Sequence, residues 1–306
     1  MQHTFGESAP HARDLGILGV ALLGASSAPP LMATIAAPAV AIAFWRNAMA
    51  LPIAVPLALW RDRADIIRLT PGLASVVLLA AAMLGTHFTA MAAALDRTSV
   101  ASAATLVCSQ SIWAALFAGV LGERLNATAW AGTGLAFVGV VVVTGVDASL
   151  ARESLGGNLL ALLAGAAGGA YMMAGGVARR RVGPSLYTAL CYSACAAGLA
   201  VVILATGRPL TGFPAQAWWQ LVALTVLAQL VGHSLFNLVM RSVSPSFVSL
   251  AQLLTVPLAI LIAAVALDES PRLAVLPGAG LMVVGIGVVL STHLRTRRGP
   301  AGREVS

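Results

Sequence analysis

The chain has 306 residues, of which 59 % are hydrophobic and only 9 % are charged, and its mean hydropathy is +0.90. Soluble domains carry roughly 25 % charged residues, so this chain has too little polar surface to fold as a water-soluble globule. Its 18 basic residues are all arginines and give a formal charge of +7. Because they lie mostly between apolar runs, they indicate membrane topology and exclude a nucleic-acid-binding surface.

Ten apolar segments follow one another along the chain, separated by charged residues, prolines or glycines. Each is close to the about 20 residues that a bilayer-spanning helix needs. The first two have no charge between them, but together they cover 46 residues, too many for one crossing. The sequence therefore predicts an all-α membrane protein with ten transmembrane helices: Leu15–Ala33, Ala39–Trp60, Leu73–Leu95, Ser99–Gly122, Ala127–Val146, Gly157–Val177, Ser185–Thr206, Gln216–Met240, Ser246–Leu267 and Leu273–His293.

The two halves of the chain repeat one another at an offset of 146 residues. With Glu123 placed over Glu269, and with no gap, Gly132 falls on Gly278. Such a repeat in so apolar a chain is typical of membrane proteins built from duplicated halves. The predicted divisions are an N-terminal tail (1–14), a first five-helix repeat (15–146), a linker (147–156), a second five-helix repeat (157–293) and a basic tail (294–306).

The distribution of arginines predicts the orientation of the chain. If the N-terminus is cytoplasmic, that side holds thirteen arginines and the opposite side holds four. The excess of positive charge marks the cytoplasmic side, so both termini are predicted there. Because each repeat has five spans, the second must be inverted relative to the first, and a substrate site is expected near the midplane between them.

Glycines and prolines inside the spans have separate interpretations. The small residues Gly132, Gly134 and Gly139 and their repeats Gly278, Gly280, Gly285 and Gly287 favour close helix packing in lipid. The Pro29–Pro30 pair must interrupt the first span, and freed backbone groups at that depth are tolerated only beside protein or a watery cavity. The break is expected either to line the pathway or to be a packing kink.

Charged and titratable residues are scarce inside the spans. All 11 acidic residues lie in tails or at span ends, which argues against a site built on a buried carboxylate. Cys108, Cys191 and Cys195 lie in apolar runs, so neither a disulfide nor a metal site is predicted, and no cofactor is expected.

Polar residues within the spans are the candidates for a substrate site. His87 and His233 are 146 residues apart and therefore occupy equivalent positions in the third and eighth spans. Gln229, His233 and Asn237 recur every four residues, on one face of an α-helix. This face either lines the pathway or joins helices through hydrogen bonds. Further candidates for the pathway lining are Ser109, Gln110 and Trp113 in the fourth span, Tyr171 in the sixth and Gln252 in the ninth.

Arg46 is the remaining charged candidate, about seven residues into the second span. A central arginine costs about 2.5 to 3.5 kcal/mol on translocon scales, although its side chain is able to snorkel toward the interface. Two interpretations stay open. Arg46 either clamps its helix to a neighbouring carbonyl group or meets a substrate carboxylate.

Several motifs resemble the drug/metabolite transporter superfamily, in its ten-span exporter branch with two EamA-type repeats. They are LGERL at Leu121–Leu125, LDESP at Leu267–Pro271, FWR at Phe44–Arg46 and the run from Ser244 to Pro257. The sequence departs from the family in one place. The first repeat has Gln110–Ser111 where such repeats commonly carry a proline, whereas the second repeat has this proline, Pro257. The departure puts a symmetric kink in the fourth and ninth spans in doubt. The resemblance implies movement of small metabolites, with amino acids a frequent substrate class.

The sequence thus favours a secondary transporter in a bacterial inner membrane that exports or equilibrates amino acids or related small metabolites by alternating access. A facilitator or efflux protein for another metabolite or an amphipathic drug is the alternative, and an intramembrane enzyme or a membrane scaffold is more remote, since HExxH and GxSxG motifs are absent. The expected partners are a small-molecule substrate and the lipid bilayer. A homodimer stays open, and nucleic acid is not expected.

Overall fold

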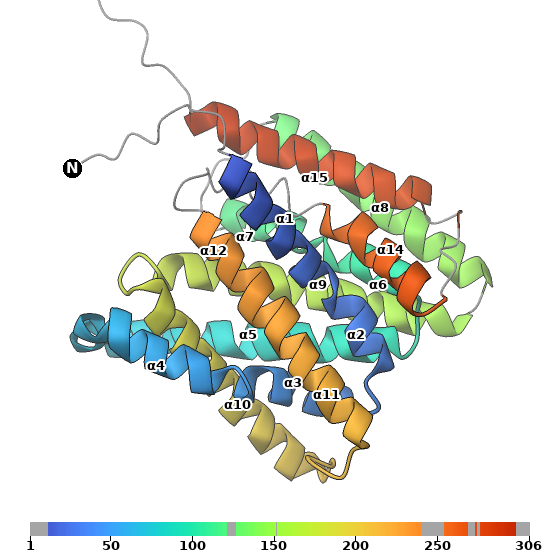
Figure 1. The fold of residues 1–306 in the computed structure, drawn as a ribbon. Helices are drawn as coiled ribbons and strands as arrows, with labels where there is room; N and C mark the ends of the chain where they lie inside the picture. The colour runs from blue at the N-terminus through green and yellow to red at the C-terminus, as the bar shows by residue number, and fades with distance from the viewer. Residues whose placement is uncertain are drawn as a thin grey trace, which may run out of the picture.

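The computed structural model describes residues 12–120, 127–150, 152–239, 254–268, 273 and 276–297, and its regular structure within these ranges is helical. Figure 1 shows the helices packed side by side in one bundle. Glu123, Glu269, Gln252 and the LGERL motif lie outside the described residues. The elements are α1 Ala12–Ser26, α2 Ala28–Thr34, α3 Ala39–Ala48, α4 Leu51–Arg61, η1 Arg63–Arg68, α5 Pro71–Leu95, α6 Val100–Val107, α7 Gln110–Val120, α8 Ala127–Leu150, α9 Arg152–Ala178, α10 Pro184–Thr206, α11 Ala215–Leu224, η2 Thr225–His233, α12 Ser234–Val239, α14 Thr255–Ala266 and α15 Leu276–Arg297.

Among the described residues, six helical stretches are long and apolar enough to cross a membrane: Ala12–Thr34, Ala39–Arg61, Pro71–Leu95, Ser154–Ala178, Pro184–Thr206 and Ala215–Gly232. Shorter apolar helices cover Val100–Ala114, Trp130–Val142, Thr255–Ala266 and Leu276–Val288. Each range overlaps one of the predicted spans. Residues 147–156, which were expected to form a linker, are mostly helical, because α8 extends to Leu150 and α9 starts at Arg152.

The first span is interrupted, as the Pro29–Pro30 pair predicts. Both prolines occupy the first turn of α2, where a missing N–H leaves no helical hydrogen bond unmade. Two hydroxyl groups donate to carbonyl oxygens on the α1 side of the break: Ser26 Oγ to Leu22 at 2.6 Å and Ser27 Oγ to Gly24 at 2.7 Å. Both are bonds from a hydroxyl group to the carbonyl oxygen three or four residues earlier in the chain.

The fourth span is also interrupted, although no proline lies there. α6 ends at Val107 and α7 begins at Gln110, with Cys108 and Ser109 between them. Leu254, which is 146 residues after Cys108, is the N-cap of α14. The two repeats therefore place a helix boundary at equivalent positions, and the missing proline at Gln110–Ser111 does not prevent it.

The eighth span contains a π-helix, η2, between α11 and α12. The four-residue spacing of Gln229, His233 and Asn237 predicted one face of an α-helix, but a π-helix places more residues in each turn. Gln229 and His233 belong to η2 and Asn237 belongs to α12. The three residues therefore do not recur on a single regular α-helical face.

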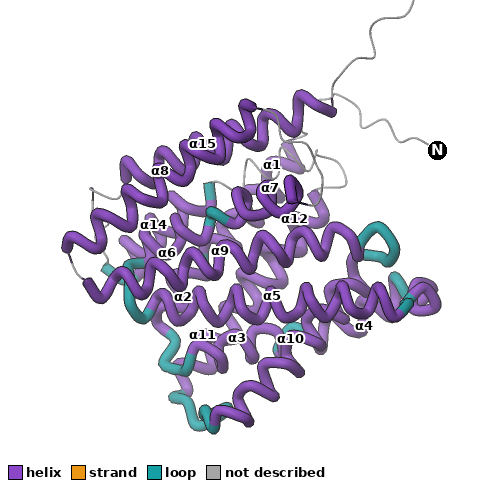
Figure 2. The backbone as a smooth tube through the Cα atoms, turned by 180° about the vertical axis from the view of Figure 1, so that it is seen from behind, coloured by secondary structure: helices purple, strands orange, loops and turns teal. Residues whose placement is uncertain are grey.

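Glycines bring α8 and α15 into close contact, and both views of the bundle show these two helices side by side (Figures 1 and 2). A Cβ atom on Gly132 would lie 2.7 Å from the Gly285 carbonyl oxygen, and one on Gly139 would lie 2.6 Å from that of Gly278. The two helices are antiparallel, since residue numbers run in opposite directions along the contact. These four glycines confirm the packing interpretation.

The remaining glycines of this group do not share that role. A Cβ atom on Gly134, Gly280 or Gly287 would meet no atom of the described chain within 4 Å. Gly134 follows Gly132 by two residues, and in an α-helix such residues point to different faces. The predicted packing role is therefore wrong for these three glycines within the described structure.

Asp62, which follows α4 in the first repeat, binds the start of α10 in the second. Its Oδ2 atom accepts hydrogen bonds from the backbone N–H groups of Ser185 at 2.7 Å and Leu186 at 3.0 Å. The Asp65 carboxylate accepts one from the N–H of Gly183 at 2.7 Å. Two carboxylates thus serve the unpaired N–H groups at a helix N-terminus, where negative charge is favourable.

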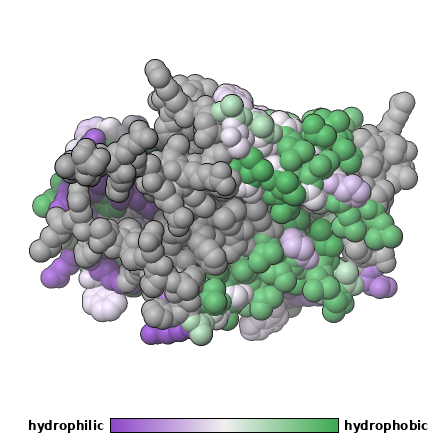
Figure 3. Space-filling view, turned by 90° about the horizontal axis from the view of Figure 1, so that it is seen from above, coloured by the Kyte–Doolittle hydropathy of each residue, from purple (hydrophilic) through white to green (hydrophobic). Residues whose placement is uncertain are grey.

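Large apolar side chains cover much of the outer surface, as Figure 3 shows for one face. Leu204 is 78 % exposed and Val265 is 80 % exposed. In water such a surface would be unfavourable, whereas in a bilayer these side chains meet lipid tails. The surface therefore agrees with a multi-pass membrane protein.

Candidate functional site

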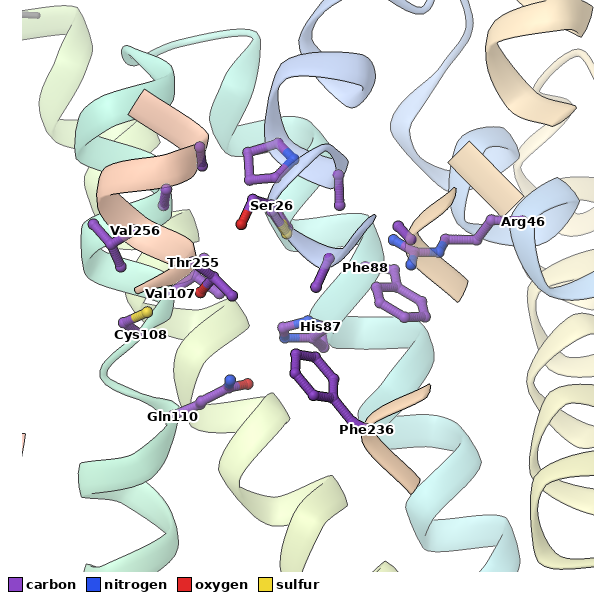
Figure 4. Close-up of a pocket in the computed structure, with 17 residues that line it drawn as sticks. Ser26, Arg46, His87, Phe88, Val107, Cys108, Gln110, Phe236, Thr255 and Val256 are labelled. Carbon is purple, nitrogen blue, oxygen red and sulfur yellow. The ribbon is translucent and has the colours of Figure 1, made fainter. Parts of the chain in front are cut away.

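A cavity of about 160 Å³ lies between residues of both repeats (Figure 4). The first repeat contributes side chains from α1, α2, α3, α5, α6 and α7, and the second contributes them from η2, α12 and α14. Apolar residues form most of its wall, among them Phe88, Met91 and Phe236. A mostly apolar wall with a few polar groups is typical of a small-molecule site.

Irregular backbone converges on this cavity from four places in the chain. The α1–α2 break contributes Ser26 and Pro29, the α6–α7 break contributes Cys108, and the start of α14 contributes Thr255. The fourth is the π-helix η2, which contributes Ala228. Non-helical backbone at membrane depth is tolerated where it is buried in protein or lines a cavity. Of the two interpretations of the Pro29–Pro30 break, the one that places it beside a cavity agrees with the structure.

Arg46 reaches this cavity from α3 and is almost completely buried, at 1 % exposure. Its Nε–H donates to Gln229 Oε1 at 2.8 Å, its Nη1 lies 3.6 Å from the Met32 sulfur, and its guanidinium carbon lies 3.5 Å from the centre of the Phe88 ring. Figure 4 shows the guanidinium beside Phe88. A charged group is thus held by an amide, a thioether and an aromatic face.

Gln229 is held in place by a chain of hydrogen bonds. Its Nε2 donates to Asn47 Oδ1 at 3.4 Å, and Asn47 Nδ2 donates to the Ala43 carbonyl oxygen at 2.8 Å. Gln229 and Asn47 are both buried, at 1 % and 0 % exposure. Because each amide oxygen accepts and each amide nitrogen donates, the chain fixes the side of Gln229 that faces Arg46.

His87 lies on α5 and joins this helix to α9. Its Nδ1 lies 2.7 Å from the Ala164 carbonyl oxygen, and because a carbonyl oxygen only accepts, Nδ1 carries the proton of this bond. Gly168 on α9 permits the approach, since a Cβ atom there would lie 2.9 Å from His87 Nδ1. His87 thus lines the cavity and also contributes to helix packing.

The structure brings together some of the predicted site residues. Arg46, His87 and Gln110 line the cavity, and Gln229 accepts a hydrogen bond from Arg46. The side chains of His233 and Asn237 lie outside the part of the chain that the structure describes, as does all of Gln252.

Three other predicted residues lie away from the cavity wall. Trp113 packs with Phe117 and Phe137, at ring-centre distances of 6.1 and 6.0 Å. Tyr171 stacks on Tyr187 at 6.4 Å. Ser109 is buried at 1 % exposure next to the α6–α7 break, and its hydroxyl has no hydrogen-bond partner among the described residues.

Sequence reasoning missed the aromatic and aliphatic wall of the cavity. Phe88, Met91 and Phe236 resemble the many other apolar residues of the spans, so no local pattern distinguishes them. Cys108 and Thr255 also line the cavity. Their helix boundaries correspond across the 146-residue repeat, but this correspondence is visible only in the structure.

Comparisons with known proteins agree with this architecture. The EamA-like transporter family matches residues 14–145 and 155–291, which is most of the chain. A solved crystal structure aligns over 94 % of this chain and 99 % of its own, with a TM-score of 0.62 and 22 % sequence identity. At that identity the likeness shows a shared fold. No curated protein matches the chain.

Proposed function

The chain belongs to the EamA-like transporter family, and on that premise we propose that it is a secondary transporter that moves amino acids or related small metabolites by alternating access. Membership of this transporter family supports a role in moving small molecules across a membrane. The observation that supports a defined pathway is the cavity of about 160 Å³, which both repeats line and on which helix breaks converge. The protein would lie in the inner membrane of a bacterium.

The proposed transport unit has ten spans in two inverted repeats, with both termini cytoplasmic. The antiparallel contact of α8 and α15 supports the inversion. Gly132 meets Gly285, which is the repeat of Gly139, and Gly139 meets Gly278, which is the repeat of Gly132. A two-fold axis in the membrane plane, which relates inverted repeats, produces this reciprocal pairing.

A second candidate function within transport is a facilitator for another metabolite or an amphipathic drug. The apolar wall formed by Phe88, Met91 and Phe236 favours ligands with a hydrocarbon body. The cavity volume of about 160 Å³ is below the roughly 300–1,000 Å³ of pockets for drug-sized ligands, so a small metabolite is the better fit.

Counterflow in proteoliposomes tests the proposal. Purified protein is reconstituted with a panel of radiolabelled amino acids, with and without an imposed pH gradient, and a subset is expected to exchange. Gln110→Ala, in the cavity wall, should lower exchange, whereas Gln216→Ala, on an exposed position of α11, should leave it unchanged. If no amino acid exchanges in the wild type, the cargo assignment is wrong, and the panel should turn to other metabolites.

A further inference from the structure

The charge of Arg46 has no counter-charge among the residues that the structure describes. All 11 acidic residues of the chain lie in its tails or at the ends of its spans. Among the described residues one ion pair is formed, between Arg68 and Asp65 in η1, outside the spans. Buried charges in proteins are ordinarily paired, because an unpaired charge loses its hydration without compensation. The neutral partners of Arg46 stabilise the position of its side chain but do not neutralise its charge.

The guanidinium also has N–H groups that donate to no residue the structure describes. It carries five N–H groups, and the described chain uses the Nε–H and one on Nη1. The Nη2 group donates to no described residue, and Arg46 is part of the cavity wall. Gln229 and the Phe88 ring hold the guanidinium in one orientation, which lowers the entropic cost of binding a ligand there.

We infer that Arg46 is the anion-binding group of this cavity and that its ligand is a small apolar compound with one carboxylate. The fork of a guanidinium matches the two oxygens of a carboxylate, and binding would neutralise the buried charge. Gln229 acts as a positioning residue. The inference rests on the proposed function, because it names the cargo class of the same cavity.

The rest of the wall decides what accompanies the carboxylate. Phe88, Met91 and Phe236 suit a hydrocarbon body, and none of the lining residues that the structure describes is an acid. An ammonium group in the ligand would therefore find no carboxylate partner in the cavity. It follows that the carboxylate is required for recognition, whereas the amino group of an amino acid is not.

Four ligands of matched shape test this inference: isocaproate, its neutral amide isocaproamide, isoamylamine and leucine. Their binding to purified full-length protein is measured by titration calorimetry at constant ionic strength. Isocaproate is expected to bind at least as tightly as leucine, and about 10- to 100-fold more tightly than isocaproamide, the range for a hydrogen bond to a charged group. Isoamylamine should bind no better than the amide.

Variants then assign the effect to Arg46. Arg46→Gln should reduce isocaproate binding to the level of the amide, and Arg46→Lys should restore part of the difference. Arg179→Gln, at the end of α9 and outside the cavity wall, is the matched control and should change nothing. Size-exclusion profiles check that each variant is folded. If Arg46→Gln does not fold, the comparison of acid with amide in the wild type still decides.

Two results would overturn the inference. One is equal affinity of the wild type for isocaproate and isocaproamide, and the other is no binding of isocaproate at all. A purely structural clamp gives the first result, together with a lower melting temperature for Arg46→Gln. Counterflow keeps this test separate from the proposed function. If leucine exchanges but isocaproate binds no more tightly than isocaproamide, only the anion-binding role of Arg46 is wrong. If binding of isocaproate depends on Arg46 but no ligand exchanges, only the transport proposal is wrong.

Discussion

Gly132 and Gly285 lie backbone to backbone where α8 crosses α15. A Cβ atom on Gly285 would lie 2.5 Å from the Gly132 carbonyl oxygen, and a Cβ atom on Gly132 would lie 2.7 Å from the Gly285 carbonyl oxygen. Both neighbours are main-chain atoms, which cannot rotate away as a side chain can. The contact therefore requires a residue without a side chain on each helix.

Gly139→Ala should destabilise the protein. The added methyl group would lie 2.6 Å from the Gly278 carbonyl oxygen and 2.8 Å from the Met282 backbone nitrogen, so α8 and α15 must separate. Overpacking of this kind costs about 1–3 kcal/mol. The measurement is thermal unfolding of the purified protein in detergent, which should show a lower midpoint. Gly134→Ala, on the same helix but facing open space, is the control and should not lower it.

Asp62→Asn should weaken the junction between the α4–η1 turn and α10. The substitution removes a charged acceptor from the N–H groups of Ser185 and Leu186, and loss of such a cap costs about 0.5–2 kcal/mol. Hydrogen exchange of the first turn of α10, followed by mass spectrometry, should become faster. An unchanged exchange rate would show that the carboxylate does not stabilise this helix end.

Asp96→Asn provides the control for that experiment. Asp96 follows the C-terminus of α5, where a negative charge is unfavourable. Partial desolvation raises the pKa of its carboxyl group, against the opposing effect of Arg97. A raised pKa means that the fold disfavours the charged form, so the neutral amide should leave stability unchanged or increase it. Hydrogen exchange in the first turn of α10 should stay unchanged in Asp96→Asn, and an acceleration as large as that of Asp62→Asn would contradict the capping explanation.

Thiol labelling should distinguish the cysteines of the native protein. Cys108 lines the cavity, whereas Cys191 and Cys195 are buried at 0 % and 2 % exposure among packed apolar side chains. A small hydrophilic thiosulfonate should therefore add once to the folded protein and three times after denaturation, as read by intact mass. Cys108→Ala should abolish the single adduct. A native adduct on Cys191 or Cys195 would show that water reaches the α5–α10 interface instead.

Reporter fusions should place both termini in the cytoplasm. The Asp62–Ser185 contact puts the turn after α4 and the turn before α10 at one end of the bundle, and these turns carry Arg61, Arg63, Arg68 and Arg179 to Arg181. Arg208, after α10, lies at the other end of that helix. A phosphatase that is active only outside the cytoplasm should be active when fused after Arg208 and inactive when fused at Ser306. The opposite result would invert the assignment.

The sequence predicted those features that depend on composition and local geometry. Apolar length located the six long apolar helices and the shorter ones that the structure describes, and the Pro29–Pro30 pair predicted the break between α1 and α2, because proline cannot continue a hydrogen-bond ladder. The break at Cys108–Ser109 has no such marker in its own repeat, so the sequence left it in doubt. Four-residue spacing led to an α-helical face in the eighth span, and the backbone forms a π-helix there instead.

The candidate site was predicted only in part, because its decisive contacts join distant segments. Arg46 was singled out as a charge within a span, but its partner Gln229 is 183 residues away, and no local pattern links them. Trp113 and Tyr171 were expected on the pathway as aromatic residues. Their rings pack against Phe137 and Tyr187, since an aromatic side chain finds apolar neighbours throughout such a bundle, and their place on a pathway stays a prediction.

The π-helix η2 has a consequence for the symmetry of the molecule. His87 belongs to a regular α-helix, whereas its counterpart in the second repeat, His233, ends a stretch in which each turn holds additional residues. The duplicated sequence therefore supplies two helices that differ in pitch at matching places. An interconversion that exchanges the roles of the two halves would not connect states related by an exact two-fold rotation, so its two end states should be unequally populated even with no gradient across the membrane.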